Sequence, residues 1–330
     1  MAAKKKRVVS GMRTTGKLHL GHYHGVLTNW LKLQDDYDCY FFAADWHALT
    51  SEYQNPAIVK ESTRDIFIDW LSVGIDPEKA TLFIQSQIKE HAELHLLLSM
   101  ITPLPWLLRN PTYKDSQVVG QGEEQATYGF LGYPVLQAAD IIIYMANLVP
   151  IGVDQLPHVE LTREITRRFN YLYGDTFPIP EPILTELSKV TGLDGRKMSK
   201  SYNNAIHLSD DEETLKNKVA SMVTDVQRAR RKDPGDPEKC NLFPLHPLYS
   251  QPEEIAEICS ACPRAEIGCV DCKKILLRNL IRGLAPVHER QSYYQNHPQL
   301  LDDIIADGTE KALAITRETM LKVRAAVKLS

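Results

Sequence analysis

SGMRTTGKLHLGHYHG, residues 10–25, lies between a short apolar run and a helical pattern. Residues 7–9 (RVV) predict a buried strand, and apolar residues return from 18 to 33 at the spacing of one helix face. A strand, a tight turn and a helix N-terminus offer free N–H groups and the positive end of a helix dipole to a phosphate, so we predict a nucleotide site here. The stretch has neither the P-loop nor the G-x-G-x-x-G pattern. In their place it carries His19-Leu20-Gly21-His22.

The first half of the chain alternates strand and helix patterns. Strands are predicted at 39–43 and 81–84, and helices at 55–71 and 90–101. Alternation at this spacing indicates an α/β fold with a Rossmann-like, doubly wound parallel sheet. Ligands should gather at the carboxyl ends of its strands, where the His19 turn and the segment from Asp45 to His47 fall.

The pattern changes after this region. Residues from about 102 to 132 carry three prolines and a polar run, so we expect a loop-rich connecting segment there. Helices are predicted at 135–145, 155–169, 272–288 and 309–329, and helical patterns dominate after residue 207. We therefore predict a nucleotide-binding domain over 1–206, which includes a glycine-containing loop at 191–206, and a helical domain over 207–330.

The composition is that of an ordinary globular protein. Of 330 residues, 43% are hydrophobic and 24% are charged, and the net charge is -4. Without overall basicity, any surface for nucleic acid must be a local patch. No run approaches the ~20 apolar residues of a membrane span, and the start MAAKKKRVV lacks the apolar core of a signal peptide. We expect a cytoplasmic protein with no membrane partner.

Two short motifs together identify a family. His19-Leu20-Gly21-His22 resembles the HIGH motif of class I aminoacyl-tRNA synthetases, and Lys197–Ser201 reads KMSKS, the second motif of that class. Either motif alone is weak, but their order and separation make the pair specific. The segments ADWHALT (44–50), YPVLQAAD (133–140) and GVDQ (152–155) resemble the tryptophan branch of the class. Without the second motif, a surface histidine cluster or a metal site from His19, His22 and His24 would be an equal alternative.

The resemblance implies a reaction and a set of residues for it. L-Tryptophan and Mg²⁺-bound ATP would form tryptophanyl-adenylate and pyrophosphate, and a homodimer would transfer the amino acid to tRNA(Trp). The attacking carboxylate is already a nucleophile, so the chemistry needs alignment and charge compensation on the phosphates. By resemblance, the catalytic residues are His19, His22, Lys197 and Lys200, and relatives often carry Asn at the position of His22. The implied ATP-binding residues are Arg13, Thr14, Thr15, Gly21, His22, Gly152, Val153, Asp154, Val190, Lys197, Met198, Ser199, Lys200 and Ser201.

Amino-acid choice would depend on Asp140, whose carboxylate can accept the indole N–H. An acceptor left buried and unpaired penalises the wrong substrate, so discrimination can be large without editing. By resemblance, Tyr133, Gln137 and Gln155 would hold the ammonium and carboxylate groups, with His47 beside the pocket. Two alternatives stay open: a tyrosine enzyme, whose Asp reads a phenol, and an amino-acid sensor that does not charge tRNA.

Five of the six cysteines crowd together, and Cys39 stands apart in an apolar strand. In a chain without secretory features this crowding suggests metal ligation before disulfides. Cys259-x2-Cys262-x6-Cys269-x2-Cys272 would suit Zn²⁺. Cys240-x21-Cys262-x6-Cys269-x2-Cys272 resembles, one residue short, the C-x22-C-x6-C-x2-C motif of bacterial tryptophan enzymes with a [4Fe–4S] cluster. The resemblance favours the cluster on the second set, with Cys259 as an alternative ligand and Zn²⁺ as the alternative metal.

Overall fold

The computed structural model describes residues 5–111, 113, 127–184 and 190–329, without the side chain of Ser201. Residues 112 and 114–126, which belong to the predicted connecting segment, lie outside this range. The chain divides into two compact units. The first unit comprises Met1–Gly16, Asn29–Glu186 and His297–Ser330, and the second comprises Lys17–Thr28 and Leu187–Asn296.

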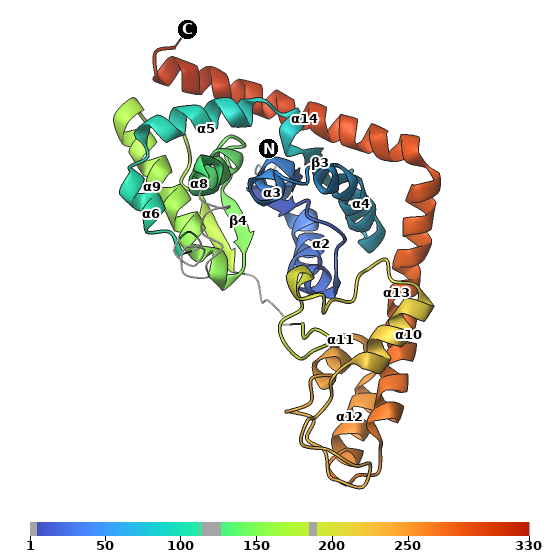
Figure 1. Cartoon of the computed structure of the whole chain (residues 1–330). Coiled ribbons are helices and arrows are strands. Elements are labelled where there is room, and N and C mark those ends of the chain that lie inside the picture. The colour runs from blue at the N-terminus through green and yellow to red at the C-terminus, as the bar shows by residue number, and fades with distance from the viewer. Residues whose placement is uncertain (1–4, 112, 114–126, 185–189, 330) are drawn as a thin grey trace. The chain divides into compact units, whose positions relative to one another are not determined.

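A parallel sheet of five strands forms the centre of the first unit (Figure 1). The strands are β1 (Arg7–Arg13), β2 (Asp38–Ala44), β3 (Ala80–Ile84), β4 (Leu148–Ile151) and β5 (Glu181–Leu184), in the order β3-β2-β1-β4-β5. This confirms the predicted Rossmann-like α/β fold. The sequence did not reveal β4 and β5, because each has only four residues and each contains a proline, a residue that argues against a strand.

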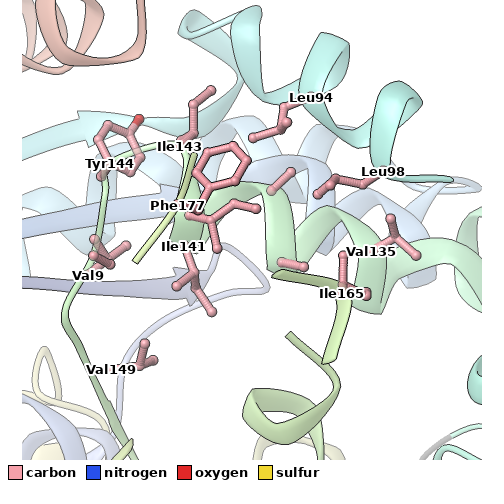
Figure 2. Close-up of a cluster of buried hydrophobic side chains, with 14 of the residues drawn as sticks. Val9, Leu94, Leu98, Val135, Ile141, Ile143, Tyr144, Val149, Ile165 and Phe177 are labelled. Carbon is pink, nitrogen blue, oxygen red and sulfur yellow. The ribbon is translucent and has the colours of Figure 1, made fainter. Parts of the chain in front are cut away.

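Helices pack against this sheet, and several of them bury one large apolar cluster. They are α2 (Thr28–Asp36), α3 (Asp45–Glu52), α4 (Ala57–Val73), α5 (Glu90–Ile101), α6 (Leu104–Leu108), α8 (Tyr128–Ile142), α9 (Leu156–Tyr173) and α14 (Pro298–Ala326), with short 3-10 turns η2 (Gln85–Gln87) and η3 (Val153–Gln155). Figure 2 shows the cluster: Leu94 and Leu98 of α5 face Val135 of α8 and Ile165 of α9. The apolar periodicity predicted α2, α4, α5, α8, α9 and α14, although α14 begins at Pro298 rather than at residue 309, and it did not predict α3 and α6.

Helix α8 begins earlier than the sequence suggested. Thr127 caps it by accepting a hydrogen bond from the backbone N–H of Phe130 at 3.1 Å, and Pro134 is accommodated inside the helix. The expectation of loop up to residue 132 is therefore wrong for its last residues, and α6 forms a further helical stretch near its start.

The last helix, α14, covers the edge strand β3. Gly308 makes the close approach possible, since a Cβ at this position would lie 1.8 Å from the carbonyl oxygen of Leu82. An uncovered edge strand would present free N–H and C=O groups to other chains. Helix α14 therefore belongs with the sheet in the first unit.

The second unit is built mainly from helices. They are α1 (Leu20–His22), the π-helical turn η1 (Tyr23–Leu27), η4 (Lys200–Tyr202), α10 (Glu212–Ser221), η5 (Phe243–Leu245), α11 (His246–Tyr249), α12 (Pro252–Ala261) and α13 (Cys269–Asn296). Helix α13 buries Leu276, Leu280 and Leu284, which confirms the amphipathic helix predicted at 272–288. Within the described residues, no helix combines the length and apolar character needed to cross a membrane.

The compact units do not follow the boundary predicted between residues 206 and 207. The His19 turn and the loop at 191–206 belong to the second unit, and α14 belongs to the first. Because the units reflect packing and the predicted domains concern function, the assignment of 1–206 and 207–330 stays a prediction.

Candidate active site

The turn that carries His19 and His22 is closed by the two imidazole rings themselves. His19 Nδ1 accepts a hydrogen bond from the backbone N–H of Gly21 at 3.1 Å, and His22 Nδ1 accepts one from the backbone N–H of His19 at 3.2 Å. A neutral imidazole that accepts at Nδ1 carries its hydrogen on Nε2. Both rings therefore offer an Nε2–H donor at the start of the helix.

Both rings are also held neutral. Burial lowers the pKa of His19 to about 4, and nearby Lys200 lowers it further. Burial lowers the pKa of His22 well below its ordinary value, with further contributions from His19 and Lys200. At neutral pH the turn thus provides two uncharged donors, the kind of group that can meet a phosphate oxygen without a change of protonation.

A metal site from His19, His22 and His24 is not supported. The Nδ1 atoms of the first two rings are occupied, and His24 Nε2 lies 2.9 Å from the hydroxyl of Tyr249. In the part of the chain that the structure describes, no three His, Cys, Asp or Glu side chains are placed so that they could hold a metal ion.

The buried histidines predict an acid-sensitive fold. Burial lowers the pKa of both His19 and His24 to about 4, against about 6.5 in an unfolded chain. Between these values the unfolded state binds protons that the folded state does not, so the free energy of unfolding should fall as pH drops from about 6.5 to about 4. Urea unfolding at pH 7.5, 6.0 and 5.0 measures this effect, and His24→Gln should reduce the pH dependence. A midpoint that does not change between pH 7.5 and 5.0 would contradict the expectation.

Asn204 organises the loop that carries KMSKS. Its Nδ2 donates to Asp194 Oδ1 at 2.7 Å and to the carbonyl of Lys197 at 3.3 Å, and its Oδ1 accepts from the backbone N–H of Ser199 at 2.9 Å. Gly195 has φ +83°, a left-handed conformation that favours glycine. No sequence pattern predicted the role of Asn204, since its partners depend on how the loop folds.

The structure brings the His19 turn and this loop together. The backbone N–H of Leu20 donates to the carbonyl of Ile206 at 3.0 Å, and that of Leu208 donates to the carbonyl of Leu18 at 3.0 Å. His19 and His207 form an antiparallel bridge between these bonds. Lys197 and Lys200 lie near enough to lower the pKa of both turn histidines. All four predicted catalytic residues therefore share one site in the second unit.

The predicted ATP-binding residues are divided between the two units. Gly21, Val190 and the residues of the loop lie in the second unit, where Met198 is buried and its backbone N–H donates to the carbonyl of Val190 at 3.0 Å. The side chain of Ser201 lies outside the described residues. In the first unit are Arg13, Thr14, Thr15, Gly152, Val153 and Asp154.

The first-unit group lies where β1 and β4 end. Arg13 is the last residue of β1 and donates to Ser51 Oγ, and Gly152 directly follows β4. Thr14 is fully buried, and among the described residues its Oγ1 has no hydrogen-bond partner. Val153 is 67% exposed. These positions agree with the expectation that ligands gather at the carboxyl ends of the strands.

Asp140 is the centre of a buried polar network in the first unit. Gln85 Nε2 lies 2.9 Å from Asp140 Oδ1 and 2.8 Å from Oδ2, His47 Nε2 lies 2.7 Å from Oδ2, and His91 Nδ1 bonds to Oδ1. Burial by itself would raise the pKa of Asp140, but the hydrogen bonds from His47 and His91 outweigh it and keep the pKa below the usual range. Asp140 is therefore a carboxylate, which only accepts hydrogen bonds.

Tyr133 borders this network, and the other two predicted tryptophan-binding residues lie apart from it. The ring of Tyr133 lies 6.2 Å from that of His47, and its hydroxyl lies 3.3 Å from His158 Nε2. Gln137 is half-buried on α8, and Gln155 donates to Asp154 Oδ2 at 3.1 Å. Gln85, His91 and His158 were not predicted as site residues. Gln85 directly follows β3, so the expectation that ligands gather at the carboxyl ends of strands could have identified it. His91 and His158 lie within helices, and no local sequence pattern marks them as site residues.

Four of the clustered cysteines interact with one another in the second unit. Burial raises the pKa of Cys272 to about 12, and Cys240, Cys262 and Cys269 each lie near enough to raise it further. Cys259 is exposed. Arg228 Nη1 lies 3.8 Å from Cys262 Sγ and 4.0 Å from Cys269 Sγ.

Comparisons with known proteins agree with both motifs. The family model of class I tRNA synthetases (W and Y) matches residues 1–285. The chain is 51% identical to the tryptophan–tRNA ligase of Thermotoga maritima over 98% of this chain and 99% of that protein, and 45% identical to that of Ralstonia nicotianae over 98% and 99%. The crystal structure of a tryptophanyl-tRNA synthetase from Campylobacter jejuni, complexed with ADP and tryptophan, matches with a TM-score of 0.90 and 34% identity, covering 98% of this chain and 100% of that chain.

Proposed function

The chain belongs to the class I tRNA synthetases of the tryptophan and tyrosine group and is a tryptophan–tRNA ligase, and on this basis we propose how its residues divide the reaction. ATP binds across the turn of His19 and the KMSKS loop, and L-tryptophan binds beside Asp140. The observation that supports this most strongly is the pairing of the two motifs, which gathers two neutral Nε2–H donors and two lysines in one place.

In the proposed activation step the tryptophan carboxylate attacks the α-phosphorus of Mg²⁺-bound ATP and pyrophosphate leaves. The Nε2–H groups of His19 and His22 stabilise negative charge on the phosphate oxygens, and Lys197 and Lys200 hold the departing pyrophosphate. The resemblance assigns nucleotide contacts also to Arg13, Thr14, Thr15 and Gly152 to Asp154 of the first unit. The unpartnered hydroxyl of Thr14 supports this role, since a buried donor without a partner is costly until a ligand meets it.

Pyrophosphate exchange and tRNA charging test the assignment together. We expect ATP–pyrophosphate exchange to depend on tryptophan and not on tyrosine, and labelled tryptophan to be transferred to tRNA(Trp). Exchange that prefers tyrosine would contradict the role of Asp140 as an indole acceptor. Exchange without charging would point to an amino-acid sensor.

We also propose that Cys240, Cys262, Cys269 and Cys272 hold a [4Fe–4S] cluster that braces the helical region. The mutual proximity of these thiols and the guanidinium of Arg228 beside two of them fit a group that needs four thiolates and neighbouring hydrogen-bond donors. A Cβ at Gly235 would lie 2.6 Å from Cys262 Sγ, so this glycine keeps room for the sulfur.

The thiols are not arranged around one point. A tetrahedral zinc site brings four sulfurs within ~2.3 Å of a single ion, and the described residues contain no such group. The corners of a cluster hold its thiolates farther apart, and metal sites commonly close only as the metal binds. When bound, the cluster would cross-link the segments that carry its four cysteines, and we assign it no redox step.

Metal analysis of anaerobically purified protein separates the cluster from zinc. We expect iron and acid-labile sulfide near about four each per chain, with broad visible absorbance. Cys272→Ser should lose most of the iron and colour, whereas the matched variant Cys259→Ser should keep both, because Cys259 is exposed. One zinc without colour, lost in Cys259→Ser, would instead assign the double CxxC set.

The homodimer that the resemblance implies is supported by an exposed apolar stripe on α5 and α6. Leu96 and Met100 lie one turn apart on α5, Leu104 and Leu108 lie one turn apart on α6, and all four are exposed. Exposed apolar patches of this kind mark interfaces between proteins. Sedimentation of the wild type and of Met100→Glu tests this proposal, which predicts a dimer that the variant weakens.

The helical region after residue 207 is proposed to bind the anticodon of tRNA(Trp) in the cytoplasm. Arg230, Arg231 and Lys232 form an exposed basic run there, and such charges neutralise phosphates on a protein whose net charge is -4. Charging kinetics with anticodon-substituted tRNA test the anticodon binding, and cell fractionation tests the cytoplasmic location.

A further inference from the structure

His91 is a buried titratable side chain that the proposed chemistry does not use. It lies in the first turn of α5 and is fully buried. Its Nδ1 meets Asp140 Oδ1, and its Nε2 lies 2.6 Å from the hydroxyl of Tyr144. The rings of Phe42, Phe83 and Tyr144 surround it at 6.1, 6.4 and 5.4 Å. In such an apolar environment each hydrogen bond is strong, and each unpaired polar atom is costly.

The hydrogen-bond partners fix the tautomer of this ring. Asp140 is ionised and can only accept, so the hydrogen must lie on His91 Nδ1. In the neutral ring Nε2 then accepts, and the buried hydroxyl of Tyr144 donates to it. Tyr144 thus holds His91 in the tautomer that donates to the carboxylate.

The two oxygens of Asp140 face different surroundings. Oδ1 accepts from Gln85 and His91, which are both fully buried. Oδ2 accepts from Gln85 and His47, and the side chain of His47 is 11% exposed and borders Tyr133. His47 is thus the partner of Asp140 that lies nearer the surface, whereas His91 lies on the fully buried side of the carboxylate.

We propose that His91, held in one tautomer by Tyr144, is a positioning residue for amino-acid recognition that keeps the Asp140 carboxylate ionised and oriented toward the tryptophan side chain. The proposal rests on the assignment of Asp140 as the indole acceptor. His91 does not touch the substrate; it acts through the carboxylate.

Two amide substitutions separate positioning from packing. The Nδ2 of Asn can replace His91 Nδ1, so His91→Asn should keep the donor to Asp140. The amide of Gln reaches toward the Nε2 position, so His91→Gln should lose that donor at similar polarity. In ATP–pyrophosphate exchange, His91→Gln and His91→Leu should raise the KM for tryptophan about tenfold to a hundredfold, the range for a lost hydrogen bond to a buried charge. His91→Asn should recover most of this loss, and the KM for ATP should stay the same in all three variants.

Tyr144→Phe tests the other end of the chain of hydrogen bonds. It keeps the aromatic ring that stacks on Tyr40 and removes only the hydroxyl, so we expect a rise of about two- to tenfold in the KM for tryptophan. The proposal would be overturned if His91→Asn, His91→Gln and the wild type had equal KM values for tryptophan and only the thermal midpoints of the variants fell. That result would show a purely structural role.

A third variant separates this proposal from the one on which it rests. β-(Benzothiophen-3-yl)alanine has the shape of tryptophan without the indole N–H, so the ratio of kcat/KM for the two substrates reports on the acceptor. If Asp140→Asn leaves this ratio unchanged, the assignment of Asp140 fails. If Asp140→Asn collapses the ratio and His91→Gln does not change it, only the role of His91 fails. We expect both variants to lower the ratio, and Asp140→Asn to lower it more.

Discussion

Replacing Lys200 with methionine is expected to lower kcat for adenylate formation about 100- to 1,000-fold, the cost of losing one preorganised electrostatic contact to developing charge. Lys200 begins the η4 turn and lies near enough to His19 and His22 to lower the pKa of both rings. The KM for tryptophan should change little, because the residues proposed to bind the amino acid belong to the other compact unit. ATP–pyrophosphate exchange measures both constants.

Two controls accompany this prediction. Lys216 is an exposed lysine on α10 in the same unit, and Lys216→Met should leave kcat unchanged. Lys200→Met should also raise the pKa of His19 toward its ordinary value, which an NMR titration of the imidazole can follow. A normal kcat in Lys200→Met would remove Lys200 from the catalytic set, whatever the NMR result.

The fold could be predicted where the sequence has a clear period. Strands β1 to β3 and helices α4, α5 and α13 have apolar residues at regular spacing, because each element buries one face or lies inside the sheet. Strands β4 and β5 were not predicted, because each is defined by its pairing with a neighbouring strand and four residues are too few to show a period. Pro182 is tolerated because β5 is an edge strand, where the missing N–H of a proline can face away from the neighbouring strand.

The candidate site could be predicted only as far as motifs extend. The His19 turn and the KMSKS loop are local strings, so their residues could be named from the sequence. The groups that hold these residues in place come from distant parts of the chain: Asn204 depends on the shape of a loop, and His91 reaches Asp140 across a separation of 49 residues. Such partners are specified by packing, and a single sequence has no period or spacing that reveals them.

Replacing Asp140 with asparagine should lower kcat/KM for tryptophan at least about 100-fold, a larger loss than any His91 variant should cause. The buried carboxylate accepts hydrogen bonds from Gln85, His47 and His91. Asparagine places one acceptor oxygen and one donor nitrogen in the same space, so at least one of these three side-chain donors then faces another donor. The substitution also removes the negative charge that attracts the indole N–H. Exchange kinetics with tryptophan and with its benzothiophene analogue measure the loss.

The matched control is Asp69→Asn, because Asp69 is a buried carboxylate of the same unit that lies in α4. That variant should keep the KM for tryptophan even where its thermal midpoint falls. A site that reads a hydrogen-bond donor rejects a substrate without that donor, because its own polar groups are then left unpaired. The Asp140→Asn substitution should therefore lower kcat/KM for tryptophan much more than kcat/KM for the benzothiophene analogue. Equal losses for the two substrates would mean that Asp140 supports the pocket without reading the indole, and the basis of tryptophan choice would then lie elsewhere in this unit.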